Sequence, residues 1–268
     1  MPAAAPIFIT RPARDAATWV QGLQAQGLNA QALPLIEIRS LPHQPELLQA
    51  WRDVAQYQAV MFVSANAVAG FFEARAVLEA LTSDNIALPA TLRAWATGPG
   101  TTRALLQARV QAAQIDAPAA DASTFDSEVL WQRVSSQVQA GTRVLMVRGT
   151  DPQHSTAQGV GRDWLTQQLQ AAGARVDTVV SYERRCPRWS TLQQQEVQAW
   201  LPHSVWVLSS SEAIRNLQSL LPGQRLEAAR AVATHPRIAQ MAEKAGFGVV
   251  ITSHPSMQEV ARSIKSLA

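Results

Sequence analysis

Hydrophobic and polar residues alternate with two different periods along the whole chain. Short apolar runs, such as residues 7–9, are followed by segments whose apolar residues recur three and four positions apart. The stripe of Trp19, Val20 and Leu23 is of this second kind, and it ends near Gly27. The first pattern predicts strands and the second amphipathic helices, and their alternation predicts an α/β fold with parallel sheets. We assign such stripes to the core and expect no ligand on them.

Four short segments recur in the same order in both halves of the chain, at offsets of roughly 130 to 145 residues. They are a strand ending on arginine, a strand ending at a hydroxyl, a turn before a proline, and a polar cap before a Glu-Val step. The pairs are 7–11 with 144–148, 62–64 with 207–209, 96–99 with 233–236, and 123–130 with 253–260. The repeat predicts two similar modules of flavodoxin-like fold, related by internal duplication and each able to bury a core. Segments 39–45 and 184–190 are the candidate connectors.

Composition narrows the class of protein. The chain has 268 residues, 47% of them hydrophobic and 16% charged, and none of its apolar runs is long enough to span a bilayer. Its first residues lack a basic leader followed by a long apolar stretch, so we expect no secretory signal and a cytoplasmic protein. Cys186 is the single cysteine, which excludes an internal disulfide and a cysteine-based metal cage.

The charge balance argues against nucleic acid as a partner. Lys and Arg total 23 against 20 for Asp and Glu, and no dense basic run occurs. Several arginines follow predicted strands, namely Arg11, Arg148, Arg184 and Arg185. Their planar guanidinium groups suit carboxylates and phosphates. The alternative is that arginine stands at these strand ends only because it is soluble there.

Hydroxyl residues also stand where predicted strands end. Ser64 follows one strand, and Ser209, Ser210 and Ser211 follow another. Ligands of open parallel sheets bind beyond the carboxyl ends of the strands, where serines can cap helices and leave amides for an anion. Capping without a ligand is the alternative. The glycine-rich turn 97–102 is shaped to receive an acidic group but lacks the lysine of a nucleotide-binding loop.

Sequence signatures of common catalytic sites are absent. The chain has no GxSxG, HExxH or complete GxGxxG motif, and its histidines lack the spacing of metal ligands, so we expect no metal. Tyr182 differs, because it ends the predicted strand 179–181 and lies beside Glu183 near a candidate connector. Its phenol is a candidate proton donor. The alternative is a tyrosine that only anchors the connector.

Taken in order, seven segments resemble the uroporphyrinogen-III synthase family over nearly the whole chain. They are ITRP at 9–12, PLIEI at 34–38, FVSANAV at 62–68, ATGPGTTRAL at 96–105, RVLMVRG at 143–149, AAGARVDTVVSYERR at 171–185 and VWVLSSSEAI at 205–214. The resemblance implies two α/β domains joined by two extended connectors. The first would comprise residues 1–38 plus 183–268, and the second residues 39–182.

The resemblance also implies an activity. Family members are lyases of haem biosynthesis that need no cofactor. They cyclise the linear tetrapyrrole hydroxymethylbilane to uroporphyrinogen III, expelling its terminal hydroxyl and inverting the last pyrrole ring through a spiro intermediate. Because the pyrrole supplies the electrons, the protein has chiefly to position the substrate and assist departure of the hydroxyl. Because hydroxymethylbilane can close spontaneously to the wrong isomer, we also expect a transient contact with hydroxymethylbilane synthase. We expect a monomer.

Particular residues match the family's site. Tyr182 corresponds to the tyrosine thought to assist loss of the hydroxyl, and Thr101 and Ser209 to substrate-facing residues. The eight carboxylates of the substrate suit the strand-end groups, for which we name Arg11, Ser64, Arg148 and Ser210.

One turn departs from the family pattern. Where many members have Gly-Pro-Thr-Thr, this chain has His235-Pro236-Arg237-Ile238, and we expect Arg237 or the backbone amides to hold a carboxylate there. Two other functions stay open on the sequence alone. One is a two-domain binding or sensor protein that closes on an anionic small molecule without turnover. The other, a nucleotide-dependent α/β enzyme, is disfavoured by the missing glycine fingerprint.

Overall fold

The computed structural model describes residues 5–119, 127–151 and 160–267, and it divides into two units. Unit 1 comprises Met1–Glu37 and Arg185–Ala268, and unit 2 comprises Ile38–Arg184. The domain boundaries expected after residues 38 and 182 stay a prediction, because the two units are defined only by their internal contacts. Residues 123–126 of the fourth repeated segment lie outside the described residues. No helix in the described ranges has the length and apolar character needed to cross a membrane.

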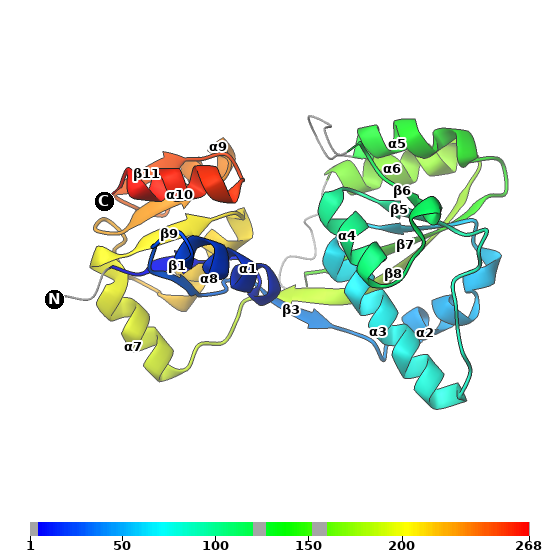
Figure 1. Ribbon diagram of the computed structural model, residues 1–268, viewed down its shortest axis with the longest axis horizontal. Coiled ribbons are helices and arrows are strands. Elements are labelled where there is room, and N and C mark those ends of the chain that lie inside the picture. The colour runs from blue at the N-terminus through cyan, green and yellow to red at the C-terminus, as the bar shows by residue number, and fades with distance from the viewer. Residues whose placement is uncertain (1–4, 120–126, 152–159, 268) are drawn as a thin grey trace. The chain divides into compact units, whose positions relative to one another are not determined.

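Unit 1 is built on one parallel sheet (Figure 1). Its strands, in spatial order, are β2 (Ala30–Ala32), β1 (Ile7–Ile9), β9 (Val205–Leu208), β10 (Arg230–Ala233) and β11 (Val249–Thr252). Its helices are α1 (Ala13–Gln24), α7 (Thr191–Trp200), α8 (Ser211–Leu220), α9 (Pro236–Lys244) and α10 (Met257–Lys265). Counted along the chain, the strand order is 2-1-3-4-5, as in flavodoxin.

Alternate residues of the unit 1 strands face two layers of helices. Ile7 and Ile9 pack with apolar residues of α1 and α10. Phe8 points to the other face, where its ring lies 4.9 Å from that of Trp206 in β9. The central strands are buried on both faces, as expected of a parallel sheet.

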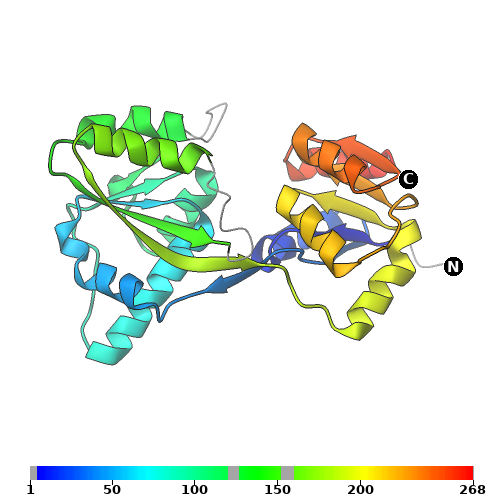
Figure 2. The same ribbon diagram turned by 180° about the vertical axis from the view of Figure 1, so that it is seen from behind.

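Unit 2 contains a second, wider sheet (Figure 2). In spatial order its strands are β3 (Glu37–Ser40), β8 (Arg175–Arg185), β7 (Arg143–Thr150), β4 (Ala59–Phe62), β5 (Arg93–Ala96) and β6 (Ile115–Asp116). Its helices are α2 (Pro45–Arg52), α3 (Ala65–Thr82), α4 (Pro99–Gln107), α5 (Ser127–Val134) and α6 (Val160–Ala171). The pairs from β8 to β6 are parallel, which confirms the predicted α/β class with parallel sheets.

Helices cover both faces of the unit 2 sheet. Val60 and Phe62 of β4 face α2, α3 and α4, and their cluster includes the stacked rings of Trp51 and Phe71. Met61, between them in sequence, faces α5 and α6, which lie side by side (Figure 1). This alternation along one strand is what buries both faces of the sheet.

The two sheets share one strand order. If β7 is counted first, then β8, β4, β5 and β6, the unit 2 order is again 2-1-3-4-5. This correspondence pairs β7 with β1, β4 with β9 and β5 with β10, as the repeated segments do. The internal duplication itself stays a prediction, since a shared order does not establish common descent.

The two predicted connectors contain strand. Residue Arg39 lies in β3, and β8 continues to Arg185, so both connectors are partly strand. The amide of Leu41 donates to the Ser181 carbonyl over 3.0 Å, and Arg39 pairs with buried Glu183 at 3.1 Å. Pairing with β8 satisfies the backbone groups of β3, which the polar sequence did not reveal.

Candidate functional site

Hydroxyl groups gather where the strands of unit 2 end. The hydroxyl oxygens of Tyr182 in β8 and Ser64 after β4 lie 3.0 Å apart. Thr97 follows β5, and its hydroxyl donates to the Val63 carbonyl over 3.3 Å. The hydroxyl of Thr101 lies 3.3 Å from that of Thr97. These contacts join β8, β4 and β5 at the carboxyl ends of a parallel sheet, where α/β folds bind ligands.

The sequence suggested that Tyr182 ends a strand. The structure instead places it, buried, within β8. Its residue is 4% exposed and belongs to the core under α2 and α3. Gly149 is its neighbour in β7, next to an irregularity in the register. A Cβ on Gly149 would lie 2.3 Å from Tyr182 Cζ, so the ring needs glycine there. The phenol oxygen meets Ser64, which is half-buried.

The first turns of α3 are held against β8 beside Tyr182. Ser64 is the N-cap of α3, and its Oγ accepts the Ala67 amide over 3.1 Å. Ser181 donates its hydroxyl to the Ala67 carbonyl at 3.2 Å. One turn later, a Cβ on Gly70 would be 2.4 Å from the Ser181 carbonyl oxygen. The absence of a side chain at Gly70 therefore lets the helix approach the strand closely.

The glycine-rich turn leads directly into a helix, as predicted. Pro99 begins α4, and Gly98 before it supplies no side-chain cap. Thr101, in the first turn, is 4% exposed. The first-turn amides of α4 thus have no side-chain acceptor, and such amides are available to solvent or to an anion.

Among the residues that the structure describes, four buried side-chain polar atoms lack a hydrogen-bond partner. They are the Nε atoms of Arg11, Arg75 and Arg148 and the Oγ of Ser211. Arg11 and Ser211 follow β1 and β9, whereas Arg148 lies within β7, which continues to Thr150 and does not end at the arginine as the sequence had suggested. These three strands lie beside the points where chain order reverses in each sheet. Leaving a buried donor unpaired costs about 1–3 kcal/mol, which a bound acceptor would recover. These atoms are therefore where an anionic ligand would gain most.

Arg11 is further held by an aromatic ring. Its guanidinium carbon lies 4.3 Å from the ring centroid of Trp19 in α1. Burial lowers the pKa of the Arg11 guanidinium from its ordinary value, and nearby Asp15 opposes that shift. Trp19 thus positions an arginine as well as packing against the core.

The strand ends of unit 1 carry hydroxyls that are engaged within the protein. Thr10 donates its hydroxyl to the Val207 carbonyl at 2.6 Å, which ties β1 to β9. Ser210 is the N-cap of α8 and accepts the Glu212 amide over 3.2 Å. Ser209, just before it, is half-buried and is not the N-cap.

The strand register shifts the correspondence between the serines of the two units by one residue relative to the sequence repeat. Phe62 pairs with Ala96 in unit 2, and Leu208 pairs with Ala233 in unit 1. Because the turns after Ala96 and Ala233 correspond, Ser64 matches Ser210 and not Ser209. The sequence could not distinguish among three successive serines, whereas the N-cap positions do.

The divergent turn of unit 1 is exposed. His235 caps α9, and its Nδ1 accepts the Arg237 amide over 3.1 Å. The imidazole therefore binds a first-turn amide of α9, whereas the corresponding amides of α4 in unit 2 have no side-chain cap. The side chain of Arg237 is solvent-exposed beyond the strand end.

The structure thus brings Tyr182, Ser64 and Thr101 together in unit 2, with Arg148 beside Gly149. The other candidates follow strands of unit 1, namely Arg11, Ser209, Ser210 and Arg237. Sequence reasoning missed the role of Gly149, although a glycine inside a strand is a signal of close approach.

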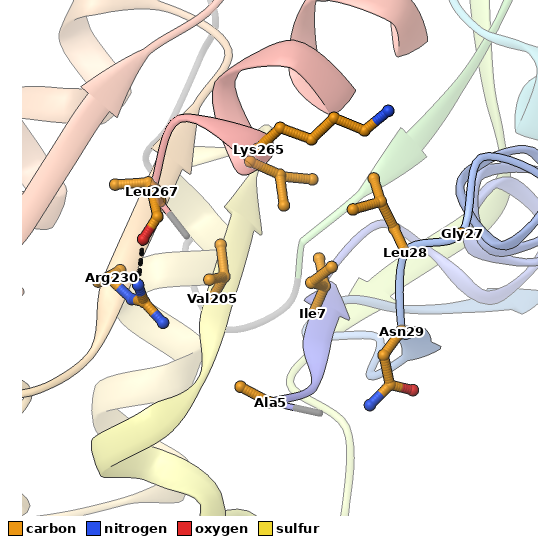
Figure 3. Close-up of a pocket in the computed structure, with 10 residues that line it drawn as sticks. Ala5, Ile7, Gly27, Leu28, Asn29, Val205, Arg230, Lys265 and Leu267 are labelled. Atoms are coloured by element: carbon orange, nitrogen blue, oxygen red, sulfur yellow. Dashed lines mark hydrogen bonds between the residues drawn. The ribbon is translucent and has the colours of Figure 1, made fainter. Parts of the chain in front are cut away.

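A separate pocket of about 340 Å³ lies at the amino-terminal ends of the unit 1 strands, opposite the candidate site residues (Figure 3). Ile7 and Val205 line it at the first residues of β1 and β9, and the Arg230 guanidinium donates to the Leu267 carbonyl. The predicted site residues are not among its lining residues. It is therefore distinct from the strand-end groups described above.

Cys186 is a partly buried thiol in unit 1. Burial raises its pKa, which favours the protonated form, and its Sγ lies 3.9 Å from the Asn216 carbonyl oxygen. In the described part of the chain, three or more His, Cys, Asp or Glu side chains nowhere gather as a metal site would require.

Comparison with known proteins yields one family and several similar folds. The family model described as uroporphyrinogen-III synthase HemD matches residues 17–261. A mutant uroporphyrinogen III synthase from Thermus thermophilus is 15% identical with a TM-score of 0.54, over 98% of each chain. A uroporphyrinogen-III synthetase from Helicobacter pylori is 16% identical with a TM-score of 0.58, over 89% of this chain and 93% of the other. At these identities the two structures support a shared fold.

Proposed function

The chain belongs to the uroporphyrinogen-III synthase family, and we propose that it converts hydroxymethylbilane into uroporphyrinogen III. This family acts on a tetrapyrrole substrate in porphyrin biosynthesis. In the proposed reaction the terminal C–O bond breaks, the hydroxyl leaves as water, and the ring closes with the last pyrrole inverted. The pyrrole nitrogen lone pair stabilises the cation formed on departure, so the protein need supply only a proton and a fixed geometry.

The observation that carries the proposal is the linked set of hydroxyls at the strand ends of unit 2. Ser64, hydrogen-bonded to Tyr182, offers an O–H group to a departing oxygen, and the hydroxyl of Thr101 lies beside that of Thr97 after the next strand. The unpaired Nε atoms of Arg11 and Arg148 support it, because carboxylates of the substrate would satisfy them. We assign these arginines, with Ser209, Ser210 and Arg237, to binding the substrate.

The test is the isomer ratio of the product. The purified chain is supplied with freshly generated hydroxymethylbilane, and the products are oxidised and separated into type I and type III uroporphyrins. We expect type III in excess over a control without protein. Type I alone, formed at the spontaneous rate while the folded chain still binds hydroxymethylbilane, would establish instead a binding protein without turnover.

A further inference from the structure

We propose that Ser64 is a second catalytic hydroxyl, and that Ser64 and Tyr182 donate a proton to the leaving hydroxyl as one unit. The proposal rests on the proposed function. Its basis is the 3.0 Å contact between the two hydroxyl oxygens, together with the amide bond that Ser64 already accepts.

Counting protons shows why the pair acts together. Ser64 Oγ accepts the Ala67 amide at 3.1 Å, so its remaining groups are one lone pair and its own proton. The hydrogen bond between the two side chains uses one of their two hydroxyl protons. One proton is left to donate outward, whichever hydroxyl donates to the other.

Burial decides which hydroxyl meets the substrate. Tyr182 is 4% exposed and packs in the core, whereas Ser64 is half-buried at the start of α3. The arrangement therefore has Tyr182 donating to Ser64 and Ser64 donating to the substrate. The N-terminus of α3 also favours negative charge at Ser64 Oγ as its proton leaves.

The step balances without a further reactant. The substrate C–O bond breaks, and its oxygen takes the Ser64 proton and departs as water. Ser64 recovers a proton from Tyr182, which is left as a phenolate. When the ring closes, the attacked pyrrole carbon loses a proton, and that proton returns through Ser64 to Tyr182. The pair ends in its starting state, and no electrons are exchanged with an oxidant or reductant.

The pair is held in place from three sides. Gly149 lies under the Tyr182 ring, with no room for a Cβ. Gly70 brings α3 onto the Ser181 carbonyl, and the Ser181 hydroxyl binds the Ala67 carbonyl. Both hydroxyls thus sit on packed elements, which fixes their separation.

The test compares Ser64→Ala, Tyr182→Phe and the double variant by steady-state kinetics with hydroxymethylbilane. General acids typically contribute about 100-fold or more to rate, so we expect Ser64→Ala to lower kcat by about 100-fold or more with KM nearly unchanged. Tyr182→Phe should lower kcat less, since Ser64 keeps its proton. The double variant should match Ser64→Ala, because Tyr182 acts through Ser64.

Further variants separate the hydroxyl from the cap. Ser64→Thr retains hydroxyl and cap and should restore most of kcat, whereas Ser64→Asn retains a capping oxygen but should not. Ser190→Ala removes a cap from α7 and should lower thermal stability with kcat unaltered. Tyr57→Phe removes the other tyrosine hydroxyl, which is bonded to Asp177, and should also leave kcat unaltered.

Two outcomes would overturn the inference. One is an unchanged kcat in folded Ser64→Ala, and the other is a double variant whose loss is the product of the two single losses. In either case the wild-type chain would still form the type III isomer, so the proposed function would stand. If wild type forms only type I, the proposed function itself fails.

Discussion

The two units have the same strand order but carry different groups near the carboxyl ends of their strands. Arg11 and Arg148 occupy matching positions, and each has a buried, unpaired Nε. The position facing the capping serine differs. The Leu35 carbonyl meets Asn216 of α8, and the Ser181 carbonyl meets the matching position, Gly70, of α3, so the next residue, Ile36, stands where unit 2 has Tyr182. The hydroxyl pair therefore belongs to unit 2, while both units retain the arginine.

The helices α8, after β9, and α3, after β4, are also attached differently in the two units. In unit 1, Asn216 of α8 donates its side-chain amide to the Leu35 carbonyl over 2.7 Å. In unit 2 the matching helix position is Gly70, which lies directly against the Ser181 carbonyl. A side chain bridges the gap in one unit, and a glycine closes it in the other. The closer helix is what brings Ser64 within reach of Tyr182.

The largest expected effect concerns the feature that the units share. We expect Arg148→Ala and Arg11→Ala each to raise KM for hydroxymethylbilane by about 10- to 100-fold, because a charge-assisted hydrogen bond contributes about 1.5–3 kcal/mol. The type III product should persist in both. Steady-state kinetics with isomer analysis measures this directly.

Lysine variants are the matched control for the arginines. Arg148→Lys and Arg11→Lys keep the charge but lose the planar fork, so their KM should fall between wild type and alanine. An unchanged KM in both alanine variants would show that the two arginines do not bind substrate and are present only for their solubility. A change at one position alone would show that the matching positions differ in role.

A smaller effect is expected where the units differ after the arginine. Unit 2 has Gly149 at this position and unit 1 has Pro12. Gly149→Ala should destabilise the protein by about 1–3 kcal/mol through overpacking against Tyr182. It should also lower kcat to near the value of Tyr182→Phe, because the ring must move. Denaturant unfolding and kinetics together measure both changes.

A second background tests whether that clash is the cause. In Tyr182→Leu the ring is gone, so adding Gly149→Ala should cost little further stability. An equal cost in both backgrounds would place the strain in the backbone of β7 and not at Tyr182.

Much of the fold followed from the sequence, because periodicity and stop signals are local. Gly27, near which the first helix was expected to end, has a positive φ of 78°. The strand-end positions of Arg11 and Ser64 were also correct, and the family match confirms the resemblance read from the ordered segments.

The sequence could not predict the strand register or how deeply individual side chains are buried. Tyr182 looked like the end of a strand because polar residues follow it, yet β8 continues to Arg185 through pairing with neighbouring strands. The Tyr182 to Ser64 contact joins residues far apart in the chain, and it depends on spaces left by Gly70 and Gly149. Such contacts arise from packing, which no local pattern encodes.

The amino-terminal edges of the two sheets offer a last contrast. Unit 1 has the pocket beside Arg230 there, whereas unit 2 has a hydrogen-bonded cluster of Tyr57, Asp177 and Arg143. The Tyr57 hydroxyl donates to Asp177 at 2.9 Å, and Arg143 binds the same carboxylate oxygen at 2.9 Å. Desolvation, followed by this hydrogen bond to Asp177, raises the pKa of Tyr57 to about 12 from its usual 10.0.

This shift predicts the smallest effect, a loss of stability in alkali. Because the folded state holds the Tyr57 proton more tightly, its contribution is complete below about pH 10 and is lost as the pH rises toward 12. Urea unfolding of wild type and Tyr57→Phe between pH 8 and 12 measures it, since other groups titrate alike in both. The stability difference between the two proteins should shrink across this range. A constant difference would mean that Tyr57 titrates alike in the folded and unfolded chains, and would contradict this prediction.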